Sequence, residues 1–228
     1  MRATAAALSG GHLMLSEDLE RVDGERLEIV RRLLPPCGQA ARPLDLFEHP
    51  FPEGYPALWA LSLDTGIGPA TALAAFNLTE ATRSFRIEPG MLGLEEGREF
   101  LALEWWQSRW LGRFDGPFTL EVPAGDVAVI HARHTGEAPS LISVSHPITG
   151  GYIVKEVVFD PVSGTLCGAL DTKAGLGLVL FGHLPEGWAL SRESRFHGIA
   201  GAIGSWQCEV VTTSAHTPFA IRFERTRS

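Results

Sequence analysis

The chain contains 228 residues, of which 45% are hydrophobic and 20% are charged, and its formal net charge is −8. This length and apolar content are sufficient for one large or two small domains with a hydrophobic core. Because nucleic acids and anionic membranes attract basic surfaces, the negative charge argues against both as partners.

The N-terminal segment and the cysteines bear on the cellular compartment. The segment MRATAAALSGG has too short an apolar run for a signal-peptide core or a membrane span. The cysteines, Cys37, Cys167 and Cys208, are odd in number and far apart, with no CxxC pattern. This usage is typical of buried thiols in a reducing compartment rather than of a disulfide framework. The sequence therefore predicts a cytoplasmic location.

Residues 1–36 are predicted to form a short strand followed by a helix. The apolar run His12–Leu15 is typical of a strand, and Ser16, which precedes two acidic residues, is a candidate N-cap. Asp23 is a second candidate N-cap, directly before ERLEIVRRLL, and the Pro35-Pro36 pair ends the helix. The apolar positions that recur at helical spacing are Leu27, Val30 and Leu34.

The rest of the chain is predicted to be almost entirely β. Residues 37–56 are rich in proline, glycine and aromatic residues, which is typical of a linker or a packed loop. In residues 57–228, strand-like runs recur about every 10 to 12 residues between glycine and proline turns. This spacing indicates an antiparallel β-sandwich. Strands are predicted at 57–63, 70–76, 83–87, 100–106, 118–122, 126–132, 205–213 and 218–224, with four more between 141 and 182.

Several stretches resemble α-galactosidase (melibiase-type) glycoside hydrolases. HPITGG at 146–151, with Gly164-Thr165-Leu166, resembles a motif of the family's C-terminal β-domain, although Ser145 stands where the family usually has arginine. The segment SGGHLMLSEDLERVDGERLEIVRRLLPP resembles the last βα unit of the catalytic TIM barrel, and RPLDLF resembles the linker that follows it. AAFN, EFLALEWW and LEVPAGDVAVI resemble further parts of the same β-domain.

The resemblance implies a noncatalytic role for this chain. The family is expected to use retaining chemistry, with two carboxylates about 5 Å apart, on earlier strands of the barrel. One βα unit cannot close a barrel of eight strands. We therefore interpret the chain as a C-terminal region that supports the barrel of an intact glycoside hydrolase. No cofactor is expected, because neither Gly175-x-Gly177 nor the glycines at 198, 201 and 204 open a helix after a strand.

Other catalytic and metal sites are not favoured by the sequence. Glu156 and Asp160, at i and i+4 on one strand, are about 13 Å apart by strand rise, too far for a retaining pair. His131 and His134 point to opposite faces of a strand, so they do not make a metal site with His146. Ser145 and His146 lack a G-x-S-x-G elbow, and adjacent strand residues point apart, which argues against a hydrolase triad.

Two alternatives to the supporting role remain open. The first is a carbohydrate-binding module, with Trp105, Trp106 and Trp110 as an aromatic platform and His146 nearby. Trp105 and Trp106 are expected to point to opposite faces, so at least one should fill the core. The second is association with a separately encoded catalytic barrel, or with another copy of this chain, through the apolar face of the helix at 24–34.

Overall fold

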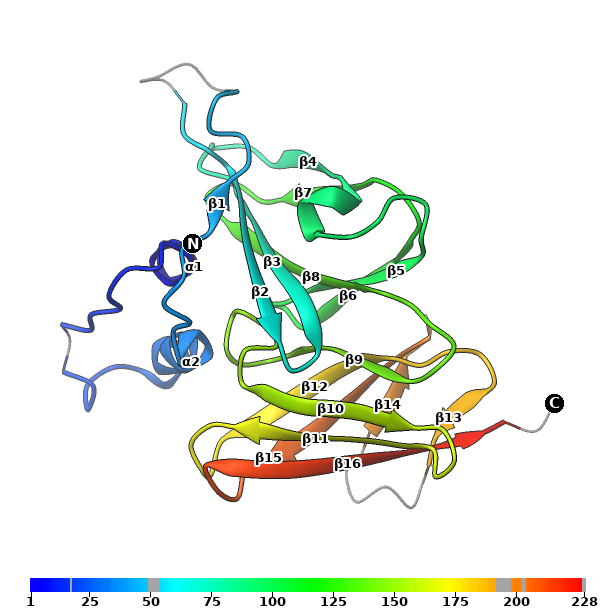
Figure 1. The fold of residues 1–228 in the computed structure, drawn as a ribbon. Coiled ribbons are helices and arrows are strands. Elements are labelled where there is room, and N and C mark those ends of the chain that lie inside the picture. The colour runs from blue at the N-terminus through cyan, green and yellow to red at the C-terminus, as the bar shows by residue number, and fades with distance from the viewer. Residues whose placement is uncertain (17, 49–53, 192–197, 202–203, 227–228) are drawn as a thin grey trace.

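The computed structural model describes residues 1–16, 18–48, 54–191, 198–201 and 204–226, without the side chains of 198–201. These residues form two short α-helices and antiparallel sheets (Figure 1), which confirms the predicted mainly β fold. The elements are α1 (Arg2–Leu8), α2 (Gly24–Leu33), β1 (Arg42–Pro43), β2 (Leu58–Thr65), β3 (Gly68–Phe76), β4 (Arg83–Ile87), the 3₁₀ turn η1 (Pro89–Leu92), β5 (Phe100–Glu104), β6 (Arg109–Phe114), β7 (Phe118–Val122), β8 (Val127–His134), β9 (Ser140–Val144), β10 (Val154–Asp160), β11 (Thr165–Asp171), β12 (Gly177–His183), β13 (Trp188–Leu190), β14 (Gly198–Gly201), β15 (Ser205–Val211) and β16 (His216–Arg225).

Strands β1 to β8 form what we call the N-terminal β unit. Its main sheet has six strands in the order β1-β2-β3-β8-β5-β6, and β4 pairs with β7 in a second sheet. The predicted hairpin between β2 and β3 is present, with Thr65 opposite Gly68. Apolar side chains of both sheets, including Phe85, Phe100 and Leu120, make one core between them.

Strands β9 to β16 form the C-terminal β unit, which lies below the N-terminal β unit in Figure 1. It consists of two four-stranded sheets, β10-β11-β16-β13 and β14-β15-β12-β9. Both sheets contribute to a shared core, with Leu180 and Trp206 from one and Leu166 and Phe223 from the other. In β16, buried and exposed residues alternate as predicted for a half-buried strand.

The two helices cover the free face of the six-stranded sheet. Leu8 of α1 and Leu33 of α2 pack in a third cluster with Leu61 and Val129 of the sheet. The sheet interior is therefore buried on both faces, and β3 and β8 each contain six consecutive buried residues. Such strands read as continuous apolar runs rather than as an alternation.

The N-terminal segment differs from its prediction in one respect. His12–Leu15 has no regular structure, and a helix, α1, precedes it instead of a strand. Of this run, only Leu13 packs against the cluster formed by α1, α2 and the sheet. Ser16 caps no helix in the described residues 18–22, and Glu17 lies outside the described residues.

The helix predicted at 24–34 is confirmed, but the last residue that it buries differs from the prediction. Asp23 is the N-cap, and its side chain accepts a 2.9 Å hydrogen bond from the Arg26 backbone N–H. Leu33 is buried, whereas Leu34 is the C-cap and is 40% exposed. The helix therefore directs Leu33, and not Leu34, toward the sheet.

Four strands were not predicted, namely β1, β6, β13 and β14. β6 has mixed exposure along its length and contains Gly112 at φ 147°, so its sequence lacks a period-two pattern.

None of the helices in the described part of the chain is long and apolar enough to cross a membrane. Cys208 is buried as predicted, and Cys167 is exposed.

Candidate functional site

The segment Ser145–Gly151 lies where the two β units and helix α2 meet, and all of its residues are buried. It follows β9 directly and includes the HPITGG motif. Gly150 has φ 69°, and a Cβ at this position would lie 2.5 Å from His131 Nδ1. Glycine is therefore required here both for the backbone conformation and for the close approach of His131.

His131 of β8 connects this segment to the N-terminal β unit. Its Nε2 is 2.9 Å from the Ile148 carbonyl oxygen, and its Nδ1 is 2.6 Å from Ser143 Oγ. A carbonyl only accepts, so Nε2 carries the proton and Nδ1 accepts from the Ser143 hydroxyl. Burial lowers the pKa of His131 to about 4; the hydrogen bond to the Ile148 carbonyl opposes this shift, and the Arg32 guanidinium adds to it to a smaller extent. The imidazole is therefore neutral at pH 7.

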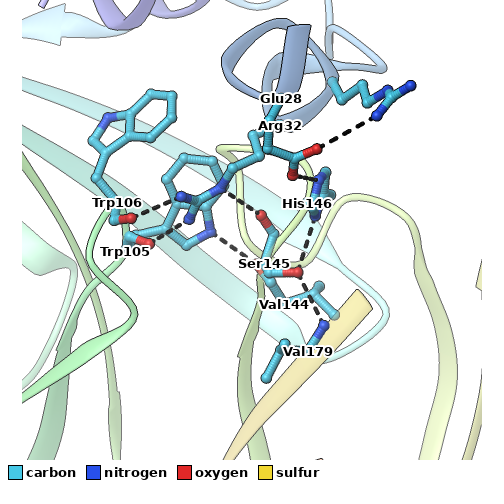
Figure 2. A network of polar contacts seen from close by, with 9 residues as sticks. Glu28, Arg32, Trp105, Trp106, Val144, Ser145, His146 and Val179 are labelled. Atoms are coloured by element: carbon cyan, nitrogen blue, oxygen red, sulfur yellow. Dashed lines mark hydrogen bonds and ion pairs between the residues drawn. The ribbon is translucent and has the colours of Figure 1, made fainter. Parts of the chain in front are cut away.

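Arg32 of α2 binds the backbone of both β units. Its guanidinium donates to the carbonyl oxygens of Trp106 at 2.7 Å, Trp105 at 2.6 Å and Ser145 at 3.3 Å (Figure 2). The same group lies over the two indoles, 4.2 Å from the Trp105 ring centre and 4.9 Å from that of Trp106. Burial lowers the pKa of Arg32, and the carboxylates of Glu28 and Glu104 oppose this shift. The guanidinium remains charged at neutral pH.

Glu104 shapes the turn that presents these carbonyls to Arg32. Its carboxylate accepts backbone hydrogen bonds from Gln107 at 2.7 Å, Val129 at 3.1 Å and Trp106 at 3.3 Å, and the residue is 2% exposed. Burial raises the pKa of Glu104, and these N–H donors oppose the shift. A buried carboxylate thus ends β5 and directs the two tryptophan carbonyls outward.

A second chain of hydrogen bonds runs through Ser145, His146 and Glu28. Ser145 Oγ is 2.9 Å from His146 Nδ1, and His146 Nε2 is 3.0 Å from Glu28 Oε1. Ser145 Oγ also accepts a 2.9 Å hydrogen bond from the Val179 N–H (Figure 2). Burial lowers the pKa of His146, and Glu28 raises it in opposition. The prediction that Ser145 and His146 point apart was wrong, because β9 ends at Val144 and the next residues are no longer extended.

These distances match those of a hydrolase relay, but the surroundings favour a structural role. Ser145 and His146 are 6% and 5% exposed, so the hydroxyl is largely closed to solvent. The lone pairs of Oγ are already directed at a backbone N–H. A nucleophile must be accessible to the atom it attacks. What the arrangement can do is fix helix α2 and the Ser145–Gly151 segment to each other.

The three predicted sugar-binding tryptophans do not share one exposed face. Trp105 is fully buried, and its Nε1 donates to the Val144 carbonyl at 2.8 Å. Trp106 is half-buried, with its ring centre 4.8 Å from that of Trp105, so the expectation that these two point to opposite faces was wrong. Both follow the end of β5 and lie in a turn. Trp110 is half-buried on β6 and contacts Phe181 edge to face.

The carboxylates and histidines weighed in the sequence are also separated. Glu156 lies at a bulge of β10 with φ 53°, and Asp160 hydrogen-bonds the following turn at Val162 and Ser163. His134 hydrogen-bonds the Glu95 N–H. Among the described residues, no group of three or more His, Cys, Asp or Glu side chains is placed to hold a metal ion.

Sequence reasoning missed Glu28, Arg32 and Glu104 as members of this network. Glu28 and Arg32 fall within the predicted helix 24–34 and Glu104 within the predicted strand 100–106. The signal that was present is a charged residue at an inward helical position, between the half-buried Val30 and the buried Leu33. A buried charge needs partners, so such a position predicts a polar network.

Comparisons with known proteins found structural neighbours of low similarity. No family model and no curated protein matches the sequence. α-Galactosidase I from Mortierella vinacea aligns with 56% of this chain and 33% of its own length, at 15% identity and a TM-score of 0.43. The isomalto-dextranase of Arthrobacter globiformis T6, solved with panose, aligns with 98% of this chain and 45% of its own length, at 11% identity and a TM-score of 0.44. The chain thus spans less than half of either protein, and similarity at this level assigns it neither an activity nor a substrate.

Proposed function

We propose that this chain is a noncatalytic supporting region of a glycoside hydrolase, and that it binds a catalytic barrel through its N-terminal segment. The sequence resemblance of residues 9–36 to a terminal barrel unit, of which the helix but not the strand is formed, and of the HPITGG motif to the attached β-domain, supports this proposal. In the described structure, the HPITGG motif is a buried junction and not an open site, which is in keeping with a supporting role.

The observation that carries the proposal is that the N-terminal segment is bound to the β units on one side and exposes apolar side chains on the other. Its inner side is fixed to the β units by Arg32 and by the buried Leu33. Its outer side leaves large apolar side chains in solvent, and this segment forms one flank of the molecule (Figure 1). Exposed apolar side chains gathered on one segment are typical of an interface. They are Met14 at 86%, Leu19 at 49%, Leu15 at 46%, Ile29 at 41% and Leu34 at 40% exposure.

The catalytic part of the proposal is tested by hydrolysis assays with 4-nitrophenyl α-D-galactopyranoside. We expect the purified chain to release no nitrophenol above the buffer rate, and the Ser145→Ala variant to behave identically. Release that is abolished in Ser145→Ala would identify the Ser145, His146 and Glu28 chain as a catalytic relay, and the noncatalytic proposal would be wrong.

The proposed barrel partner is tested first by DNA sequencing and then by a binding assay. The DNA upstream of the Met1 codon is read for barrel strands with catalytic aspartates, in frame or in a neighbouring frame. The encoded barrel is then co-expressed with this chain and captured through a tag on the barrel. We expect Ile29→Lys to reduce capture about tenfold or more, because it places a charge in an apolar interface.

The matched control for binding is Val158→Lys, on β10. Val158 is 64% exposed and lies far along the chain from the N-terminal segment, so capture should be unchanged. Sedimentation velocity of the chain alone shows whether a second copy of the chain, rather than a barrel, binds the apolar side of the N-terminal segment. A dimer that Ile29→Lys dissociates, or equal losses in the two variants, would contradict the proposed barrel interface.

A further inference from the structure

A polar pocket lies at the boundary between the two β units, apart from the Arg32 network. Its volume is about 450 Å³, within the range of about 300–1,000 Å³ that small-molecule sites occupy. The N-terminal β unit contributes Glu99, Arg113 and Thr135, and the C-terminal β unit contributes His183, Glu186 and Arg225. Ligand sites are frequent at such boundaries, because each side supplies groups in a fixed relative position.

Hydrogen bonds hold the polar groups of this pocket in place. Glu99 Oε1 accepts from Arg113 Nη1 at 2.6 Å and from Thr135 Oγ1 at 2.7 Å. Arg113 Nη2 lies 3.3 Å from His183 Nε2 across the boundary. A site whose donors and acceptors are already oriented loses less entropy when a ligand binds.

The opposite rim of the pocket is fixed by Trp188. The Arg225 guanidinium lies 4.2 Å from the centre of the Trp188 ring, and Trp188 Nε1 donates to the Glu137 carbonyl at 3.2 Å. Glu137, which also lines the pocket, is thereby tied to the C-terminal β unit. Both rims are therefore preorganised.

His183 forms part of the pocket wall and is 1% exposed. Burial, and to a smaller extent the charge of Arg113, lowers its pKa to about 4, so the ring is neutral at pH 7. Because the guanidinium donates to Nε2, the proton of the neutral ring is on Nδ1. Among the described atoms, Nδ1 makes no hydrogen bond, and neither does Oγ of Ser205, which is opposite His183 in the β12 to β15 ladder. Both atoms are buried behind the pocket wall, so they do not contact a ligand in the pocket.

The charges of the lining are mixed rather than of one sign. The lining contains the carboxylates of Glu99, Glu137 and Glu186 and the guanidinium groups of Arg113 and Arg225. An anion would be repelled by the former and a cation by the latter. A neutral ligand with several hydroxyl groups can donate to the carboxylates and accept from the guanidinium groups at the same time.

We infer that this pocket binds a neutral polyhydroxylated ligand of the mono- or disaccharide class, bridging the two β units. The inference does not depend on the proposed supporting function, because it concerns different residues and a different face of the molecule. It also differs from the tryptophan platform considered from the sequence, since Trp105 and Trp106 are not part of the lining.

The test is isothermal titration of the full chain with D-galactose, D-glucose, isomaltose and melibiose, and with inorganic phosphate as the anionic probe. We expect saturable binding of at least one saccharide and none of phosphate. Glu137→Gln and Glu186→Gln should each weaken saccharide binding about tenfold, the effect of losing one hydrogen bond to a charged acceptor. The bound saccharide should also raise the unfolding temperature, because it binds only the folded chain.

The matched control is Glu209→Gln, which makes the same chemical change at an exposed position of β15 outside the lining. It should leave the affinity unchanged. The inference is overturned if no saccharide binds, if phosphate binds instead, or if the three glutamine variants weaken binding equally. Loss of binding in Trp110→Ala but not in the two pocket variants would place the saccharide on β6, and would overturn it as well.

Discussion

The Arg32 guanidinium lies 4.2 Å from the centre of the Trp105 indole and also donates a 2.6 Å hydrogen bond to the Trp105 carbonyl oxygen. The indole in turn donates from Nε1 to the Val144 carbonyl, at the end of β9. Arg32 also reaches the Ser145 carbonyl. These two side chains therefore connect helix α2, the N-terminal β unit and the C-terminal β unit at one point.

Substitution of Arg32 should release helix α2 from this point. Arg32→Met keeps much of the length of the side chain but removes the donors for the carbonyls of Trp105, Trp106 and Ser145. We expect the free energy of unfolding to fall by about 3 kcal/mol, because these acceptors lose their charged donor. Urea denaturation followed by tryptophan fluorescence measures the change.

The neighbouring arginine provides the control for this prediction. Arg31 has a side chain that is 55% exposed and pairs with Glu28 at 3.8 Å. Arg31→Met should therefore change the free energy of unfolding by less than about 0.5 kcal/mol. Equal effects of the two substitutions would show that the buried network does not hold the helix.

The close approach at Gly150 should make this position intolerant of any side chain. Gly150→Ala places a Cβ 2.5 Å from His131 Nδ1 and 2.9 Å from Ser143 Oγ, at φ 69°. We expect a loss of about 3 kcal/mol or more, from backbone strain together with displacement of buried side chains. Gly175→Ala, at φ 81° with nothing within 4 Å, isolates the backbone contribution and should cost only about 1 kcal/mol. Similar urea midpoints for the two variants would contradict the steric argument.

The element pattern could be predicted from the sequence, because local signals are strong in this chain. The hairpin of β2 and β3, the strands 83–87 and 118–122, and the Asp23 cap appear where turn residues and periodicity place them. The strand predicted at His12–Leu15 was wrong, since a short apolar run can equally be a loop, here with Leu13 packed against the helices and Met14 and Leu15 exposed. Which of these occurs depends on tertiary neighbours that the run itself does not specify.

The partners of Arg32 and Glu28 could not be predicted, because they are far apart from them in the sequence. Glu28 and His146 are 118 residues apart, and Arg32 and Ser145 are 113 apart. The pairing of Trp105 and Trp106 depends on where β5 ends, and a buried carboxylate at Glu104 sets that point. The end of a strand is the least predictable part of its pattern.

Stability should depend on pH through His131. Its folded-state pKa, about 4, lies below the ordinary value of 6.5, so the unfolded chain binds more protons between these two values. The contribution of the neutral imidazole is fully present above pH 6.5 and is lost as the pH falls toward 4. We expect His131→Gln to show a shallower fall in the urea midpoint between pH 7 and pH 4.5 than the wild-type chain.

The measurement compares slopes and not absolute stabilities, because His131→Gln also changes the hydrogen bonds to Ser143 and Ile148. The His183 imidazole contributes in the same direction in both proteins, since burial lowers its pKa to about 4 as well. A residual slope is therefore expected in the variant. Parallel profiles would contradict a neutral, buried His131 in the folded state.

The hydroxyl of Ser145 should matter for stability through the backbone that it binds. Ser145→Ala leaves the Val179 N–H without its 2.9 Å acceptor and removes the hydroxyl next to His146 Nδ1. We expect a loss of about 2 kcal/mol, the cost of a buried donor whose partner is removed. Ser163→Ala, which removes an exposed hydroxyl bonded to Asp160, should cost less than about 0.5 kcal/mol in the same urea titration. A Ser145→Ala variant with the urea midpoint of the wild-type chain would contradict this prediction. The serine would then not be required to hold the Ser145–Gly151 segment, and its position beside His146 and Glu28 would have a role other than a structural one.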